Sequence, residues 1–137
     1  MAEQIINQIP GYENGIMQAI GFEDPKMVLP RAAEVVSELL NKWNTTVLFI
    51  SLTCRSEALK ALVKNESKVA RLYTIDQRNP DPGVILRKAR GVVNRRFVRA
   101  IVLEGVTISP QQIEDWSKRF KRWSRTHEII IGEISDD

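Results

Sequence analysis

Cysteine and histidine are almost absent from this chain of 137 residues, which contains one of each, Cys54 and His127. An internal disulfide is therefore impossible, and a cysteine-based zinc site cannot be assembled from this chain. A nucleophilic Cys54 would have only His127 as a histidine partner, whereas a single cysteine at a strand end is more often a small, partly buried residue. The sequence thus gives little support to cysteine chemistry.

Long apolar runs and several catalytic motifs are also missing. No stretch approaches the length of a transmembrane helix, and the opening MAEQIINQIPGYENG lacks the basic and apolar segments of a secretory signal. We therefore expect a soluble, cytoplasmic protein without membrane contact. The glycine-rich dinucleotide fingerprint, the Gly-x-Ser-x-Gly motif and a helix with paired histidines do not occur. Hydrolase and dehydrogenase functions lose their main support.

Apolar residues are plentiful enough for one core, because they make up 43% of the sequence. Nearly continuous apolar runs predict buried strands over residues 46–52, 69–75, 97–103 and 128–134. Between them, apolar residues at helical spacing predict amphipathic helices. The first helix begins at Pro30 and carries an apolar stripe from Ala32 to Trp43. Later helices begin at a capping Ser56, near Gly83, and at Ser109 and Pro110.

Strands that alternate with amphipathic helices predict an α/β fold, with right-handed crossovers that place helices on both faces of a sheet. We expect a single three-layer domain over residues 30–137, with a mostly parallel sheet of about four or five strands. Glycines and prolines interrupt residues 1–29 too often for a long regular element. This segment is expected to form an irregular N-terminal arm.

Acidic residues stand at the ends of several expected strands. In open α/β sheets, ligands usually bind beyond the carboxyl ends of the strands, where this chain has Asp76, Glu104 and Glu133. If these strands are neighbours, the three carboxylates could converge as oxygen ligands for Mg²⁺. The alternative is that they are ordinary polar residues where the chain leaves the core. No short-range spacing enforces convergence, so both interpretations stay open.

The segment from Gly21 to Met27 precedes the first long helix, where a phosphate-binding loop would lie. Such a loop needs flexible glycines whose backbone N–H groups face phosphate, a lysine, and a hydroxyl ligand for Mg²⁺. Two acids and Pro25 are poor substitutes for the cradle, and Met27 cannot ligate Mg²⁺. Lys26 alone does not restore the site. Neither nucleotide hydrolysis nor a bound cofactor is expected.

The order of a lysine-containing loop, a helix, the strand Val47–Leu52 and a serine-initiated helix resembles the ATPase core of RecA-like proteins, especially the replicative DNA helicases. Ala100–Glu104 is similar to their acidic-ended strand. The helix Ile113–Arg125 and the segment Ile129–Glu133 are similar to their helix and sensor strand. The resemblance covers roughly residues 20–135 and departs mainly in the nucleotide loop. It implies a degenerate RecA-like domain that pairs side by side with itself or with an active relative.

Basic residues gather in two stretches, although the formal net charge is only +3. Both stretches place cations on the outer faces of expected helices, where they could contact phosphates of DNA or RNA. The candidate nucleic-acid-binding residues are Arg87, Lys88, Arg90, Arg95, Lys118, Lys121, Arg122 and Arg125. The alternative is that these charges provide solubility. Trp116, Phe120 and Trp123 share the opposite, apolar face and are expected in the core rather than stacked on bases.

Three functions follow from these features. The favoured one is a non-catalytic RecA-like module that binds nucleic acid, or regulates a related ATPase, in a nucleic-acid-processing assembly. The second is a protein-interaction subunit whose basic faces meet solvent or an acidic partner. The third is a metal-dependent phosphoryl-transfer enzyme or nuclease that uses the three carboxylates.

Overall fold

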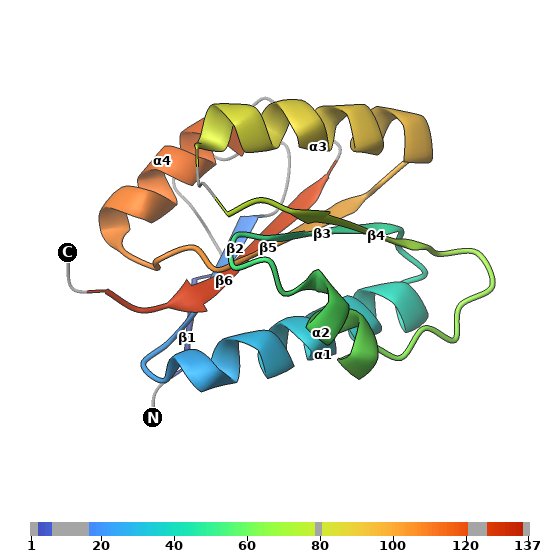
Figure 1. The fold of residues 1–137 in the computed structure, drawn as a ribbon, viewed down its shortest axis with the longest axis horizontal. Helices are drawn as coiled ribbons and strands as arrows, with labels where there is room; N and C mark the ends of the chain where they lie inside the picture. The colour runs from blue at the N-terminus through green and yellow to red at the C-terminus, as the bar shows by residue number, and fades with distance from the viewer. Residues whose placement is uncertain (1–2, 7–16, 79–80, 121–125, 136–137) are drawn as a thin grey trace.

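The structure, a computed structural model, describes residues 3–6, 17–78, 81–120 and 126–135 and forms one six-stranded sheet (Figure 1). The strand order is β1-β2-β6-β5-β3-β4, in which β1 is antiparallel to β2 and the other neighbours are parallel. The strands are β1 (Glu3–Ile6), β2 (Met17–Phe22), β3 (Val47–Ser51), β4 (Leu72–Asp76), β5 (Ala100–Glu104) and β6 (His127–Glu133).

Helices cover both faces of the sheet, which confirms the predicted three-layer α/β fold. The α1 (Val28–Asn41) and α2 (Ser56–Leu62) helices lie on one face, and α3 (Pro82–Arg96) and α4 (Pro110–Phe120) lie on the other (Figure 1). A short 3₁₀ helix, η1 (Pro25–Met27), leads into α1. No helix in the described part of the chain is long and apolar enough to cross a membrane.

The central strands β3 and β5 are buried along their whole length, as their continuous apolar sequences predicted. Alternate residues serve two cores: Phe49 and Val102 pack with α1, whereas Ile50 and Leu103 pack with α3 and α4. The predicted core position of Trp116 and Phe120 is confirmed, with ring centroids 5.6 Å apart. Trp123 lies outside the described residues.

The prediction of an irregular arm over residues 1–29 is wrong for the parts that the structure describes. β2 pairs in parallel with β6, and its Ala19 and Ile20 are buried. The glycine that interrupted the pattern is required by packing, because a Cβ on Gly21 would lie 2.6 Å from Ile134 Cγ1. β2 therefore covers an edge of β6 that would otherwise be unpaired.

The ends of the elements differ from the prediction where tertiary contacts decide them. α1 begins at Val28 rather than Pro30 and ends at Asn41, so Trp43 lies beyond the helix. The prediction that the apolar stripe of this helix extends to Trp43 is wrong, because the residue is 62% exposed. β4 begins at Leu72 rather than residue 69. Residues 121–125, expected to end the last helix, lie outside the described part of the chain.

Candidate functional site

Glu104 ends β5 at the centre of the carboxyl edge of the sheet and is fully buried. Its Oε1 accepts hydrogen bonds from Ser51 Oγ and Thr53 Oγ1, each at 2.8 Å. Its Oε2 forms an ion pair with Arg55 Nη2 at 3.2 Å. Ser51 Oγ also accepts from the Arg55 N–H at 2.9 Å. The carboxylate thus holds the loop after β3 against the end of β5.

Asp76, at the end of β4, has a different partner. Its Oδ1 accepts from the Ser56 N–H at 3.2 Å, and its Oδ2 accepts from Ser56 Oγ at 2.8 Å. The prediction that Ser56 caps α2 is therefore wrong, because Ser56 is the first helical residue and Arg55 occupies the N-cap position without a side-chain hydrogen bond. Asp76 supplies the missing acceptor from the neighbouring strand.

The predicted metal ligands do not form a common site. Among the described residues, which include Asp76, Glu104 and Glu133, no group of three or more His, Cys, Asp or Glu side chains could hold a metal ion. Glu133 is exposed at the end of β6. Cys54 and His127 are also separated, because Cys54 follows the carboxyl end of β3 and His127 starts β6 at the opposite edge. The geometry therefore does not support the metal hypothesis or a Cys54–His127 pair.

The loop after β2 is built around a carboxylate rather than a phosphate cradle. Asp24 Oδ1 accepts a hydrogen bond from the Lys26 backbone N–H at 2.9 Å, in the first turn of η1. That N–H is one of the groups that a phosphate at a helix start would need. Asp24 therefore places a negative charge where the phosphate would bind, while Lys26 is exposed beside it.

The predicted nucleic-acid-binding residues of α3 are all exposed: Arg87, Lys88, Arg90 and Arg95. The helix starts at Pro82, and Asp81 Oδ1 caps it by accepting from the Gly83 N–H. Its inner face packs through Ile85 and Ala89, which leaves the long cations on the outer side. Lys88 Nζ donates to Gln77 Oε1 at 2.6 Å.

The second predicted group, on the last helix, is described only in part. Lys118 is exposed on α4 and forms an ion pair with Glu114 at 3.0 Å. Lys121, Arg122 and Arg125 lie outside the described residues. Of the two predicted groups, the structure therefore shows an exposed cationic surface on α3, whereas on α4 the charge of Lys118 is balanced by Glu114.

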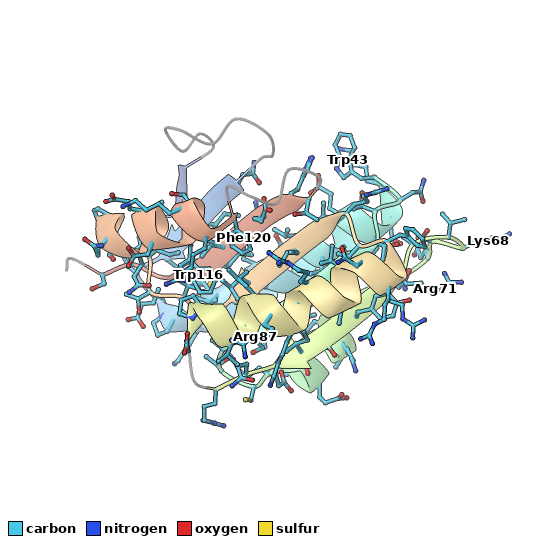
Figure 2. All side chains as sticks on the ribbon, turned by 90° about the horizontal axis from the view of Figure 1, so that it is seen from above. Trp43, Lys68, Arg71, Arg87, Trp116 and Phe120 are labelled. Carbon is cyan, nitrogen blue, oxygen red and sulfur yellow. The ribbon has the colours of Figure 1, made fainter. Side chains whose placement is uncertain are left out.

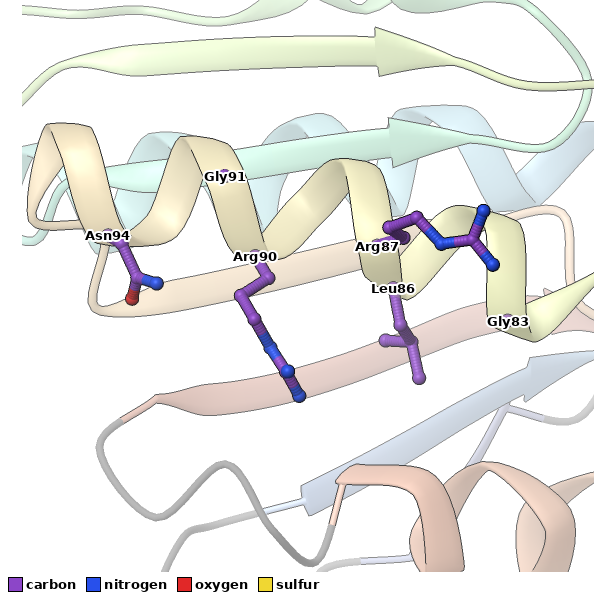
Figure 3. A pocket seen from close by; sticks show the side chains of 6 residues that line it. All are labelled: Gly83, Leu86, Arg87, Arg90, Gly91 and Asn94. Carbon is purple, nitrogen blue, oxygen red and sulfur yellow. The ribbon is translucent and has the colours of Figure 1, made fainter.

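A hollow of about 510 Å³ runs along α3, and two of the predicted cations, Arg87 and Arg90, line it. Figure 3 shows Leu86, Arg90 and Asn94 pointing from one side of α3 toward the region above β6. Gly83 and Gly91 also line the hollow, and because they have no side chains they leave space at the helix surface. The hollow therefore lies beside the cationic face of α3, and Arg87 and Arg90 are its charged lining residues.

A second basic surface, which the sequence patterns did not predict, lies at the amino edge of the sheet. The segments that precede β3, β4 and β5 meet there through backbone hydrogen bonds from the Val47 N–H to Arg71 O and from the Arg99 N–H to Thr46 O. Figure 2 shows Lys68 and Arg71 near each other at this end of the molecule, with Trp43 projecting from the same half. We call the exposed cations and aromatics here the amino-edge patch: Lys42, Trp43, Lys68, Arg71, Arg95, Arg96, Phe97 and Arg99.

Few carboxylates balance this patch. Lys42 Nζ lies 3.9 Å from Glu38, and Arg96 lies over the Tyr73 ring at 5.6 Å. Within the described ranges, no carboxylate pairs with Lys68, Arg71 or Arg99. The signal that could have revealed the patch is the occurrence of aromatic residues inside the basic segments just before strands, NKWN and NRRFVR.

No family model and no curated protein sequence matches the chain.

Proposed function

We propose that this α/β domain is a non-catalytic module that binds DNA or RNA through the phosphate backbone. The observation that carries the proposal is the concentration of exposed cations on α3 and the amino-edge patch, with few carboxylates beside them. Such a surface produces a local positive field even though the net charge of the chain is small. The resemblance to RecA-like cores suggests a place beside a related, nucleic-acid-dependent ATPase.

We infer that the cations of α3 and of the amino-edge patch act as one track, because a single helix joins them. The exposed face of α3 carries Arg87 and Lys88 in its first half, and the helix ends at Arg95 and Arg96 in the amino-edge patch. Five phosphate contacts along this track would give a log–log salt slope of about −4.5, so affinity would fall roughly 500-fold between 50 and 200 mM salt. This salt dependence is a quantitative expectation of the proposal.

The carboxyl edge favours binding over catalysis. Catalytic carboxylates must reach substrate or a metal, whereas both oxygens of Glu104 are occupied by protein groups and Asp76 caps α2. Freeing the buried Glu104 for chemistry would break the contacts that hold the loop after β3. Asp76 is exposed, and both of its oxygens accept hydrogen bonds from Ser56 at the start of α2.

The test is a titration of labelled single-stranded and double-stranded oligonucleotides across a salt series. Replacing Arg87 and Arg95 by Gln should weaken binding and reduce the salt slope by about 1.8, because two phosphate contacts are lost. The control replaces Lys26 and Lys60 by Gln, which removes the same charge from exposed sites outside the track. Its slope should change by less than about 0.5. No binding at low salt, or equal effects of the two double variants, would refute the proposal.

A further inference from the structure

Two exposed aromatic side chains in the amino-edge patch carry an inference that rests on the proposed function and makes it more specific. Trp43 is 62% exposed and Phe97 is 74% exposed. All other tryptophan and phenylalanine side chains in the described part of the chain are at most 6% exposed. Among the described tryptophan and phenylalanine side chains, the two that are exposed therefore both stand among cations at one edge of the sheet.

Phe97 is unfavourable for stability on two counts. It follows the end of α3 with φ +55°, a left-handed conformation that favours glycine, and its N–H donates to Val93 O. Its apolar ring also projects into solvent. Glycine here would relieve the backbone and remove the exposed ring. A bulky residue in such a conformation at the surface is a candidate for a role in binding.

Trp43 stands at the corresponding place after the other helix. Its N–H donates to Glu38 O just past the end of α1, and Lys42 Nζ lies 5.6 Å from the centre of its ring. α1 and α3 cover opposite faces of the sheet (Figure 1). Trp43 follows α1 and precedes β3, and Phe97 follows α3 and precedes the neighbouring strand β5. Arg99 follows Phe97 just before β5, and Arg71 precedes β4 on the other side of β3. Backbone hydrogen bonds join both segments to the start of β3.

We propose that the amino-edge patch binds single-stranded nucleic acid by stacking unpaired bases on Trp43 and Phe97 while Arg71 and Arg99 contact the phosphates. Every base has a flat face that can stack on an aromatic ring, so this contact is largely independent of sequence. In a duplex those faces are already stacked inside the helix, and the two rings have no matching surface. The patch should therefore prefer single strands, whereas the cations of α3 bind either form.

The surrounding charge favours nucleic acid over a protein as the occupant. Apolar rings alone would suit a hydrophobic protein surface, but Lys68, Arg71 and Arg99 have no carboxylate partner among the described residues. A polyanion that also presents flat apolar faces fits both the charges and the rings.

The experiment measures binding of a labelled single-stranded oligonucleotide and of the duplex of the same sequence to the full chain. Trp43→Leu and Phe97→Leu keep apolar bulk but remove the flat ring. Each should weaken single-strand binding by about 5- to 100-fold, leave duplex binding within about twofold, and leave the salt slope unchanged. Trp43→Phe should retain most of the affinity. Val69→Ala, at an exposed aliphatic residue of the same edge, is the matched control and should have no effect.

Phe97→Gly separates folding from binding. It should raise the melting temperature, because glycine accepts the left-handed conformation, and should still weaken single-strand binding as strongly as Phe97→Leu. Unchanged single-strand binding in both leucine variants, with salt-dependent binding retained, would overturn the stacking site and leave the proposed function standing. No binding of any oligonucleotide would overturn both. Ring-dependent binding of polyglutamate as tight as that of the oligonucleotide would overturn the inference in favour of an acidic protein partner.

Discussion

Replacement of Glu104 by Ala tests whether this buried carboxylate is a structural residue. The substitution removes the Glu104 acceptor of the fully buried Ser51 hydroxyl, which keeps only a 3.2 Å contact with Thr53 Oγ1, and it removes the ion-pair partner of Arg55. Losing one partner of a buried pair typically costs 3–5 kcal/mol, but Arg55 is 38% exposed, so water compensates part of the loss. We expect a destabilisation of about 3 kcal/mol, most of it from the buried hydroxyl and the lost packing.

Urea and thermal unfolding measure this effect. For a domain of 137 residues, a loss of about 3 kcal/mol corresponds to a fall in melting temperature of about 10 °C. Glu104→Gln keeps the shape and one acceptor oxygen, so it should cost about half as much. Arg55→Ala removes only the partly exposed partner and should cost about 1 kcal/mol or less.

Two results would contradict this reasoning. If Glu104→Ala is within about 0.5 kcal/mol of the parent chain, the hydrogen bonds around Glu104 do not contribute to stability as the geometry indicates. If Mg²⁺ raises the melting temperature of the parent chain but not of Glu104→Ala, the carboxylate is a metal ligand. The second result would restore the metal hypothesis that the arrangement of the carboxylates does not support.

Two further predictions concern backbone packing and capping. Gly132→Ala should cost at least about 3 kcal/mol, because its Cβ would lie 1.5 Å from Val106 O, whereas Gly91→Ala in α3 should stabilise by up to about 1 kcal/mol. Urea unfolding of both variants checks this, and equal effects would show that the clash relaxes. Asp76→Ala should cost about 1 kcal/mol by removing the acceptor at the start of α2, and Asp76→Asn should recover most of it. If Asp76→Asn destabilises the domain as much as Asp76→Ala, the negative charge rather than the hydrogen-bond cap stabilises α2.

The elements whose signal is local were predictable. Five consecutive buried positions in β3 and again in β5 produce continuous apolar runs, because a strand in the middle of a parallel sheet has no solvent-facing side. The apolar face of α4 likewise predicted the burial of Trp116 and Phe120. The exposure of Arg87 and Arg95 on α3 followed from the same periodicity.

Elements whose stability depends on distant partners were not predictable in this way. The sequence of β2 is short and contains Gly21, and it forms a strand because β6 offers an unpaired edge more than a hundred residues later in the chain. Asp76 caps a helix that starts 20 residues before it, and Glu104 binds a hydroxyl 53 residues away. Neither pairing leaves a short-range pattern.

The amino-acid sequence alone determined the α/β class, the central strands and the cationic outer face of α3, because hydrophobic periodicity is a local property of the chain. The tertiary structure decided the strand order, the partners of the carboxylates and the exposure of Trp43 and Phe97. Strand order brings the segments before β3, β4 and β5 to one edge of the sheet. Only that long-range arrangement turns basic and aromatic residues from separate segments into a single surface.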